Sequence, residues 1–354
     1  MSDGAILMTA LSQSKNAPAP VAFVTGATGL LGNNLVRALL AEGFQVRALA
    51  RSETKAKQQF DGLPVEIITG DLQSISSFNA ALSGVDVLFH TAAYFRDSYT
   101  GGNHDQDLEA INVKAMKELL DTSWKAGIRR MVHASSIAVL KGAKGQTVDE
   151  TMLRREDEAD PYFRSKIRSE KVLNDFLADY PEFWACMVLP GWMHGPGDRG
   201  PTSAGQTVLD VARGKLPGIP PGSVSLIDAR DVALAMIACL SKGKRGERYL
   251  AAGRHQTMAD LIPLIARLTG RKAPSRQIPM PLLYVIAALS EVQARLTRKP
   301  VLMSWATAKA LASENDRSHF SAHRFHHDLG LTFRPLEETL TDEINWFRKA
   351  GFLP

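Results

Sequence analysis

The sequence predicts an α/β protein built on a parallel β-sheet with helices on both of its faces. From residue 21 onward, short runs of β-branched and apolar residues alternate with segments of helical periodicity. The chain has 354 residues, of which 45% are hydrophobic and 22% charged. This composition is typical of globular proteins, and the length suits one large domain or two closely joined ones.

Each apolar run predicts a strand that ends near a glycine, a polar residue or a small residue. The amphipathic segments between them read as helices that cross over the sheet, and ligands of such sheets bind at the carboxyl ends of the strands. The predicted strands are 21–26, 44–50, 65–70, 85–93, 130–140 and 184–191, and the predicted helices among them are 30–42, 105–126 and 161–178.

Composition also excludes several classes of protein. The 42 Lys and Arg residues give a net charge of +5 but form no long block, which argues against a nucleic-acid surface. The two cysteines, Cys186 and Cys239, lie in apolar runs and predict buried free thiols. The N-terminus lacks the pattern of an export signal, and no apolar stretch is long enough to span a bilayer. We therefore expect a soluble, cytoplasmic protein.

The segment TGATGLLG, residues 25–32, directly follows the first predicted strand and opens a helix. In this context Gly26 permits a tight turn, Gly29 lets the backbone approach a pyrophosphate, and Gly32 lets the helix pack closely on the strand. The free N–H groups at the start of the helix then face the phosphates. A glycine-rich turn without a ligand is the alternative. The cofactor-binding residues predicted here are Gly26, Thr28, Gly29, Leu30, Leu31 and Gly32.

The end of the second predicted strand indicates which dinucleotide binds. A carboxylate there would bind the ribose 2′-hydroxyl of NAD and repel a 2′-phosphate. At the position where such a carboxylate would stand, this sequence has Ala50, and Arg51 and Ser52 follow it. A guanidinium matches a phosphate in charge and in geometry. The sequence therefore favours NADP(H), with NAD(H) as the alternative cofactor. A solvated basic helix face is the competing interpretation of Arg51.

Together these motifs resemble those of the extended short-chain dehydrogenases/reductases, in the NAD-dependent epimerase/dehydratase superfamily. Within it, the chain is similar to the branch of dihydroflavonol 4-reductase and 3β-hydroxysteroid dehydrogenase. The resemblance covers about residues 21–352 and implies a Rossmann-type, doubly wound sheet. Besides the glycine segment it rests on GDL (70–72), HTAA (90–93), INVKAMKELL (111–120), HASSIAVL (133–140), YFRSK (162–166), LPGWMHGPGD (189–198) and DARDVALAM (228–236).

Tyr162 and Lys166 are four residues apart, so they share one face of a helix. The resemblance makes Tyr162 the general acid for a carbonyl oxygen, or the base in the reverse direction. A free tyrosine titrates at about pH 10, and the Lys166 ammonium should lower that pKa. Lys166 would also hold the nicotinamide ribose. Two ordinary residues of a polar helix face are the alternative reading.

Ser136 is assigned to the substrate oxygen, whose developing charge it would stabilise. Ser135 points to the opposite side if the strand alternation holds, so only one of the two serines can serve. The resemblance selects Ser136. It also makes Asn112 a residue that helps to order the catalytic site; a hydrogen bond from its helix to the backbone is an equal alternative.

Further cofactor-binding residues are implied by the same resemblance. They are Asp71 and Leu72 beside the adenine, Thr91, Ala92 and Ala93 beside the ribose and pyrophosphate, and Pro190 and Met193 beside the carboxamide. No metal is expected. His323 and His327 lie four apart in HRFHHD, but no third ligand accompanies them and the chemistry needs none.

We expect three parts in the chain: a flexible lead-in at 1–20, a Rossmann NADP-binding and catalytic domain at 21–191, and a mostly helical substrate-binding region at 192–354 with segments that return to the sheet. The apolar segment 279–289 is expected to be a buried helix or a hydrophobic lid. The resemblance further implies a homodimer through the helices at 105–126 and 161–178.

The predicted function is the NADPH-dependent, reversible reduction of a ketone or aldehyde on a small molecule. A sugar-nucleotide epimerase or dehydratase that recycles NAD is one alternative. Leu140, Lys141 and Gly142 stand where many such enzymes have Val-Tyr-Gly, and Leu189 replaces an arginine common before the proline. A non-catalytic protein that senses NADP is the other alternative, although Ser136, Tyr162 and Lys166 are all intact.

Overall fold

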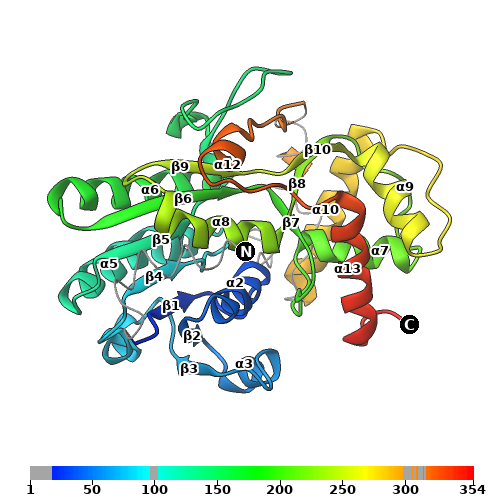
Figure 1. The fold of residues 1–354 in the computed structure, drawn as a ribbon. Helices are drawn as coiled ribbons and strands as arrows, with labels where there is room; N and C mark the ends of the chain where they lie inside the picture. Colours follow the sequence, from blue (N-terminus) through cyan, green and yellow to red (C-terminus); the bar gives the residue numbers. More distant parts are fainter. Residues whose placement is uncertain (1–17, 96–102, 298–304, 306–307, 310–313, 315) are drawn as a thin grey trace.

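A computed structural model describes residues 18–95, 103–297, 305, 308–309, 314 and 316–354. Its centre is a seven-stranded parallel sheet in the order β3-β2-β1-β4-β5-β6-β9 (Figure 1). The order reverses between β1 and β4, which marks the place where doubly wound sheets bind ligands. The predicted fold class is confirmed. Residues 1–17 of the predicted lead-in lie outside the described part of the chain.

All six predicted strands are present, and each is shorter in the structure than in the prediction, four of them by a single residue. The two largest differences are at 85–93 and 130–140, where the chain leaves the sheet at His90 and Ala134. The six are β1 (Val21–Thr25), β2 (Gln45–Ala50), β3 (Val65–Thr69), β4 (Val87–His90), β5 (Arg130–Ala134) and β6 (Trp184–Pro190). The seventh strand of the main sheet, β9 (Arg248–Ala251), was not predicted.

Alternate side chains of the strands enter two separate cores. Val24 of β1 packs in the core under α2 (Leu30–Ala41) and α8 (Ala229–Lys242), whereas Phe23 packs in the core under α5 (Ala115–Lys125) and α6 (Pro161–Asp179). The sheet is buried on both faces, so its strands read as nearly continuous apolar runs. The short helix α3 (Glu53–Gln59) follows β2.

The predicted helix at 105–126 is interrupted. It begins as α4 (Asp105–Leu108), widens into a π-helical segment at Glu109–Lys114, and continues as α5. Single π-turns inside α-helices occur often at functional sites, and this one contains Asn112. Helical periodicity in the sequence does not reveal such a turn.

After residue 191 the chain builds a small three-stranded sheet and several helices. β8 (Ser223–Asp228) pairs in parallel with β7 (Trp192–His194) and antiparallel with β10 (Arg254–Thr257). A third apolar core lies among α7 (Ser203–Ala212), α9 (Met258–Leu268) and α13 (Leu336–Lys349). β9 returns to the main sheet beside β6. Figure 1 shows α7, α9 and α13 gathered at one side of the main sheet, with α12 (His323–His327) above it.

The segment expected as a buried helix or a lid forms α10 (Met280–Thr297). Only one of its faces is buried, at Leu283 and Ala287. Leu282, Val285 and Leu289 are 50, 55 and 66% exposed, so the interpretation as a fully buried helix is wrong. No helix in the described ranges has the length and apolarity needed to cross a bilayer.

Candidate active site

The glycine turn after β1 leaves no room for side chains at two of its three glycines. Gly26 has φ +68°, and a Cβ there would lie 2.7 Å from the backbone nitrogen of Ala92. A Cβ on Gly32 would lie 2.2 Å from the carbonyl oxygen of Gly26. The turn can therefore bring β1, β4 and α2 close together only because both positions are glycine.

Gly29 differs from the other two glycines. It is exposed at the N-cap of α2, with φ −77°, and a Cβ there would meet only the Gly26 carbonyl oxygen at 3.4 Å. No side chain caps this helix. Leu30 and Leu31 begin the helix and Thr28 lies half-buried before it. An uncapped, glycine-lined helix start suits a pyrophosphate, which needs backbone N–H groups and close approach.

The ends of β1 and β4 are tied together beside this turn. The Thr91 hydroxyl donates to the Thr25 carbonyl oxygen at 2.7 Å, and the Thr25 hydroxyl bonds His90 Nδ1 at 2.8 Å. Burial lowers the pKa of His90 to about 3, so the imidazole is neutral at physiological pH. Ala92 and Ala93 continue from this junction at the carboxyl edge of the sheet, half-buried and exposed respectively.

The residues predicted to meet the adenosine half follow β2 and β3. Arg51 is exposed directly after the buried Ala50. The Ser52 hydroxyl accepts a hydrogen bond from the Lys55 N–H at 3.4 Å and thereby caps α3. Beyond β3, Asp71 is half-buried and Leu72 is buried. Each of these residues lies at the same edge of the sheet as the glycine turn, because β1, β2 and β3 are parallel neighbours.

Tyr162 lies in the first turn of α6. Asp160 caps this helix by accepting from the Phe163 N–H at 3.0 Å, and Pro161 occupies the first helical position, which a proline favours. The Tyr162 ring is buried in an apolar cluster with Leu108. Packing therefore holds the ring, and the helix start holds its backbone.

Phe95 and Ala138 complete the surroundings of Tyr162. The Phe95 ring meets it edge-on with 4.7 Å between ring centroids. Ala138, two residues after Ser136, belongs to the same apolar cluster. The turn after β5 therefore contacts the first turn of α6, and this contact brings Ser136 and Tyr162 to one part of the sheet edge.

Lys166 lies one helical turn after Tyr162, and its ammonium is buried. Its Nζ donates to the Ala134 carbonyl oxygen at 3.2 Å, at the last residue of β5. Burial lowers the pKa of Lys166 to about 8, and the nearby Glu170 carboxylate opposes that change. The lysine therefore lies close to the end of the serine strand and still carries charge at neutral pH.

The two serines after β5 have different partners. The Ser135 hydroxyl donates to the Glu170 carboxylate inside the protein, whereas Ser136 is half-buried. The Ser136 oxygen accepts from the Ala138 N–H at 3.1 Å and caps the short turn that follows. Its hydroxyl hydrogen is not used in that bond. This difference favours the choice of Ser136 over Ser135.

Asn112, at the π-turn, ties two other segments together. Its side-chain oxygen accepts from the Tyr94 N–H at 2.7 Å, and its Nδ2 donates to the Tyr94 carbonyl oxygen and to the Ser165 hydroxyl. Ser165 in turn donates to the Tyr162 carbonyl oxygen at 2.8 Å. The Asn112 side chain thus bonds a distant loop at Tyr94 and the first turn of α6 through Ser165, rather than only the backbone of the helix that carries it.

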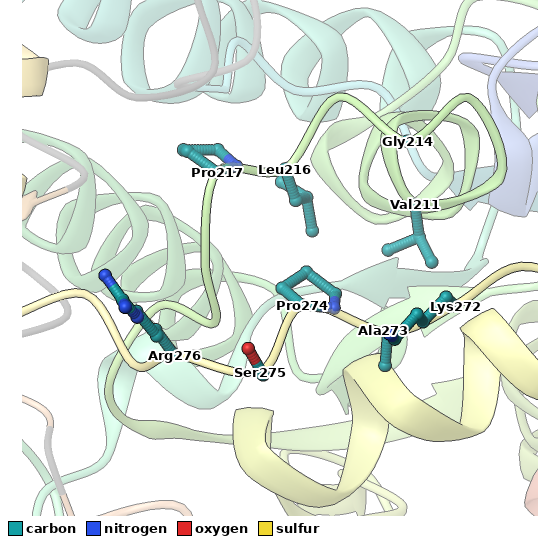
Figure 2. Close-up of a pocket in the computed structure, with 9 residues that line it drawn as sticks. All are labelled: Val211, Gly214, Leu216, Pro217, Lys272, Ala273, Pro274, Ser275 and Arg276. Atoms are coloured by element: carbon teal, nitrogen blue, oxygen red, sulfur yellow. The ribbon is translucent and has the colours of Figure 1, made fainter.

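Pro190 is the buried last residue of β6, and Met193 lies half-buried in β7. β6 is the strand next to β5, and β7 follows β6 in the sequence. A separate surface pocket of about 320 Å³ lies elsewhere, between residues 211–217 and 272–276 (Figure 2). Val211, Leu216 and Pro274 line it, and none of the predicted site residues does.

The two histidines considered as metal ligands lie on α12 with their rings stacked at 5.3 Å. His327 Nδ1 bonds the Asp328 carboxylate at 2.9 Å. Within the described ranges no group of three or more His, Cys, Asp or Glu side chains could hold a metal ion.

Sequence reasoning missed Glu170, Ser165 and Tyr94. Glu170 stands four residues after Lys166, so the spacing of Tyr162, Lys166 and Glu170 on one helix face was available as a signal. Ser165 and Tyr94 carry no such signal, because their role depends on a contact between segments far apart in the sequence.

The chain forms a doubly wound parallel sheet with a glycine turn at its switch point, and Ser136, Tyr162 and Lys166 lie near the end of β5 and the start of α6. These features are typical of an oxidoreductase that binds a nicotinamide dinucleotide. The sequence model of the NAD dependent epimerase/dehydratase family matches residues 22–252 of this chain. The chain belongs to this family, that of the extended short-chain dehydrogenases/reductases.

Relatives and solved structures agree with this assignment. The chain is 34% identical to "Sterol demethylase protein B" of Methylococcus capsulatus, over 94% of this chain and 99% of that protein. It is 31% identical to "Putative dihydroflavonol 4-reductase" of Synechocystis, over 94% and 95% of the two chains. The crystal structure of gox2253 matches with a TM-score of 0.80 at 30% identity, over 94% and 99%.

Proposed function

We propose that this protein is an NADPH-dependent reductase of a ketone or aldehyde, and that the reaction is reversible. The observation that carries the proposal is the arrangement on α6. Tyr162 is fixed in the first helical turn, and the buried Lys166 ammonium lies one turn later beside the end of the serine strand. Such a set can deliver a proton to a carbonyl oxygen that Ser136 holds.

Each residue has a separate task in this proposal. The Ser136 hydroxyl donates a hydrogen bond to the substrate oxygen, and the Tyr162 hydroxyl gives it a proton. The Lys166 charge favours the tyrosinate that remains. The bound dinucleotide supplies the hydride when it is in the reduced form. Asn112 fixes the turn that carries Tyr162 through Ser165.

The preference for the phosphorylated cofactor rests on the end of β2. Ala50 offers no carboxylate to a ribose 2′-hydroxyl, and the exposed Arg51 can pair with a 2′-phosphate. The names of the relatives, a dihydroflavonol reductase among them, support a reductase on a carbonyl substrate.

A carbonyl panel tests the proposal. NADPH consumption is followed with aliphatic, aromatic and polycyclic ketones and aldehydes, and the best substrate is repeated with NADH. The proposal predicts steady turnover with NADPH, a lower kcat/KM with NADH, and loss of turnover in Tyr162→Phe. Turnover that is unchanged in Tyr162→Phe would contradict it.

A further inference from the structure

The exposed apolar side chains of this protein are concentrated on one helix. In the described part of the chain seven large apolar side chains are strongly exposed, and six of them are on or against α10. Those six are Leu282 at 50%, Val285 at 55%, Leu289 at 66%, Val292 at 56%, Leu296 at 81% and Trp305 at 47%. Soluble proteins rarely expose a contiguous patch of this kind without a partner for it.

The five α10 residues form a single stripe. Their spacing alternates between three and four residues, so they follow one another along one side of the helix. The opposite side packs on the protein through Leu283 and Ala287. From residue 280 to 290 the helix carries no charged residue. The stripe is therefore a continuous apolar surface that faces outward.

Trp305 extends this surface. Its ring lies 5.1 Å from that of Tyr284 on α10, and its backbone N–H donates to the Glu291 carboxylate at 3.0 Å. The indole is therefore held against the helix while nearly half of the residue remains exposed. Tryptophan and tyrosine are enriched where apolar surface meets lipid headgroups.

The stretch of sequence that contains the stripe is basic. Residues 271–299 contain six Lys or Arg and one Glu, so this segment alone carries a net charge equal to the +5 of the whole chain. In the sequence Arg271, Lys272 and Arg276 precede α10, and the other three are Arg295, Arg298 and Lys299, of which the last two lie outside the described residues. An apolar helix face within a basic stretch of sequence complements an anionic bilayer, which attracts the charges and takes up the apolar side chains.

We propose that α10 and Trp305 dock the protein onto the surface of an anionic phospholipid bilayer, with the apolar stripe buried among the headgroups. A second copy of the chain fits this face less well. Two copies that met through α10 would bring together two segments that each carry a net positive charge, and like charges brought together oppose association. The proposal does not depend on the reductase activity, and docking of one helix face needs no spanning segment.

Vesicle sedimentation of the full chain tests it, with phosphatidylcholine vesicles and with vesicles that also contain phosphatidylglycerol. We expect binding to the anionic vesicles that weakens as salt rises. Val285→Glu with Leu289→Glu should lower the bound fraction about tenfold or more, and Val285→Ser with Leu289→Ser should lower it without a change of charge. Thr54→Glu with Gln58→Glu, an equally spaced and exposed pair on α3, should bind nearly as well as the wild type.

Melting temperature and light scattering accompany each variant. Absence of binding by the well-folded wild type would overturn the proposal, as would an equal loss in the α3 pair. A dimer that dissociates only in the α10 variants would assign the face to a second copy instead. Because the readout is sedimentation, failure here leaves the proposed catalytic activity untouched.

Discussion

Ser135 donates a hydrogen bond from its hydroxyl to the carboxylate of Glu170, although the two residues are 35 positions apart in the sequence. Glu170 also accepts from Arg248 on β9 at 2.8 Å, and it lies one turn after Lys166 on α6. This buried carboxylate therefore fixes the serine strand, the edge strand and the catalytic helix relative to one another. It also raises the pKa of Lys166 against the effect of burial.

Replacing Glu170 by Gln should move the pH profile of the reaction. Without the carboxylate, burial lowers the pKa of Lys166 further below about 8, and the ammonium loses its proton at a lower pH. The alkaline limb of the kcat profile should shift to lower pH by roughly half a unit or more. Ser135→Ala keeps the charge and should shift it less. An unshifted limb in Glu170→Gln would show that Glu170 has only a structural role.

Tyr162→Phe removes the proton donor but keeps the ring that packs against Phe95 and Leu108. We expect the nucleotide to bind as before while kcat falls by about 10²-fold or more. Tyr180→Phe, at the other end of the same helix, is the matched control and should retain its activity. The measurements are steady-state rates and nucleotide binding by fluorescence.

Arg51→Ala should separate the two nicotinamide cofactors. Loss of a charged hydrogen bond to the 2′-phosphate should weaken NADPH by about 1.5–3 kcal/mol and leave NADH nearly unchanged. Lys57→Ala makes the same change in net charge at an exposed residue that already pairs with Glu53 at 2.6 Å. Equal losses for NADPH and NADH in Arg51→Ala would mean that Arg51 does not contact the phosphate.

The glycine turn offers a pair of substitutions with opposite expectations. A methyl group on Gly32 collides with the Gly26 carbonyl oxygen, so Gly32→Ala should lower the melting temperature by several degrees or prevent folding. A methyl group on the exposed Gly29 has room in the protein itself. Gly29→Ala should therefore keep the melting temperature and weaken dinucleotide binding. A normal affinity in Gly29→Ala would indicate that the phosphates lie elsewhere.

The buried Asp198 should make the free energy of unfolding depend on pH. Burial raises the pKa of this carboxyl to about 7, and Thr202 donates to it from its N–H and its hydroxyl. Because the folded state keeps the proton that the unfolded chain releases near pH 3.8, this group stabilises the fold below about pH 4. That contribution is lost as the pH rises towards 7.

Urea denaturation at pH 5 and at pH 8 tests this expectation. In Asp198→Asn the loss of unfolding free energy between the two values should shrink by at least about 1 kcal/mol. The exposed Asp61→Asn should behave as the wild type does. If the two variants show the same pH dependence, burial of Asp198 does not control stability.

Much of the sheet could be predicted because parallel strands are buried on both faces and appear as uninterrupted apolar runs. β1, β2 and β3 were bounded to within a residue by the glycines and polar residues around them. β9 was harder to predict. It has only four residues and begins with Arg248, whose side chain pairs with Glu170, so neither its length nor its composition indicates a strand of the main sheet.

In the candidate site, too, some features could be predicted from local sequence and others could not. The glycine turn and the spacing of Tyr162 and Lys166 are local patterns, and the sequence shows them directly. The contact of Asn112 with Tyr94 and Ser165, and the exposed face of α10, depend on how distant segments pack. Apolarity predicted a helix at 279–289 but did not reveal which side faces outward. The homodimer through α5 and α6 stays a prediction.

The most direct test of the proposed reductase activity is to measure the nucleotide bound to the purified protein together with the NADPH consumed per turnover. A reductase releases oxidised cofactor after each turnover, so the protein should purify largely free of NAD and consume one NADPH for each carbonyl reduced. Stoichiometric NAD that resists dialysis, together with epimerisation of a nucleotide sugar without added cofactor, would contradict the account.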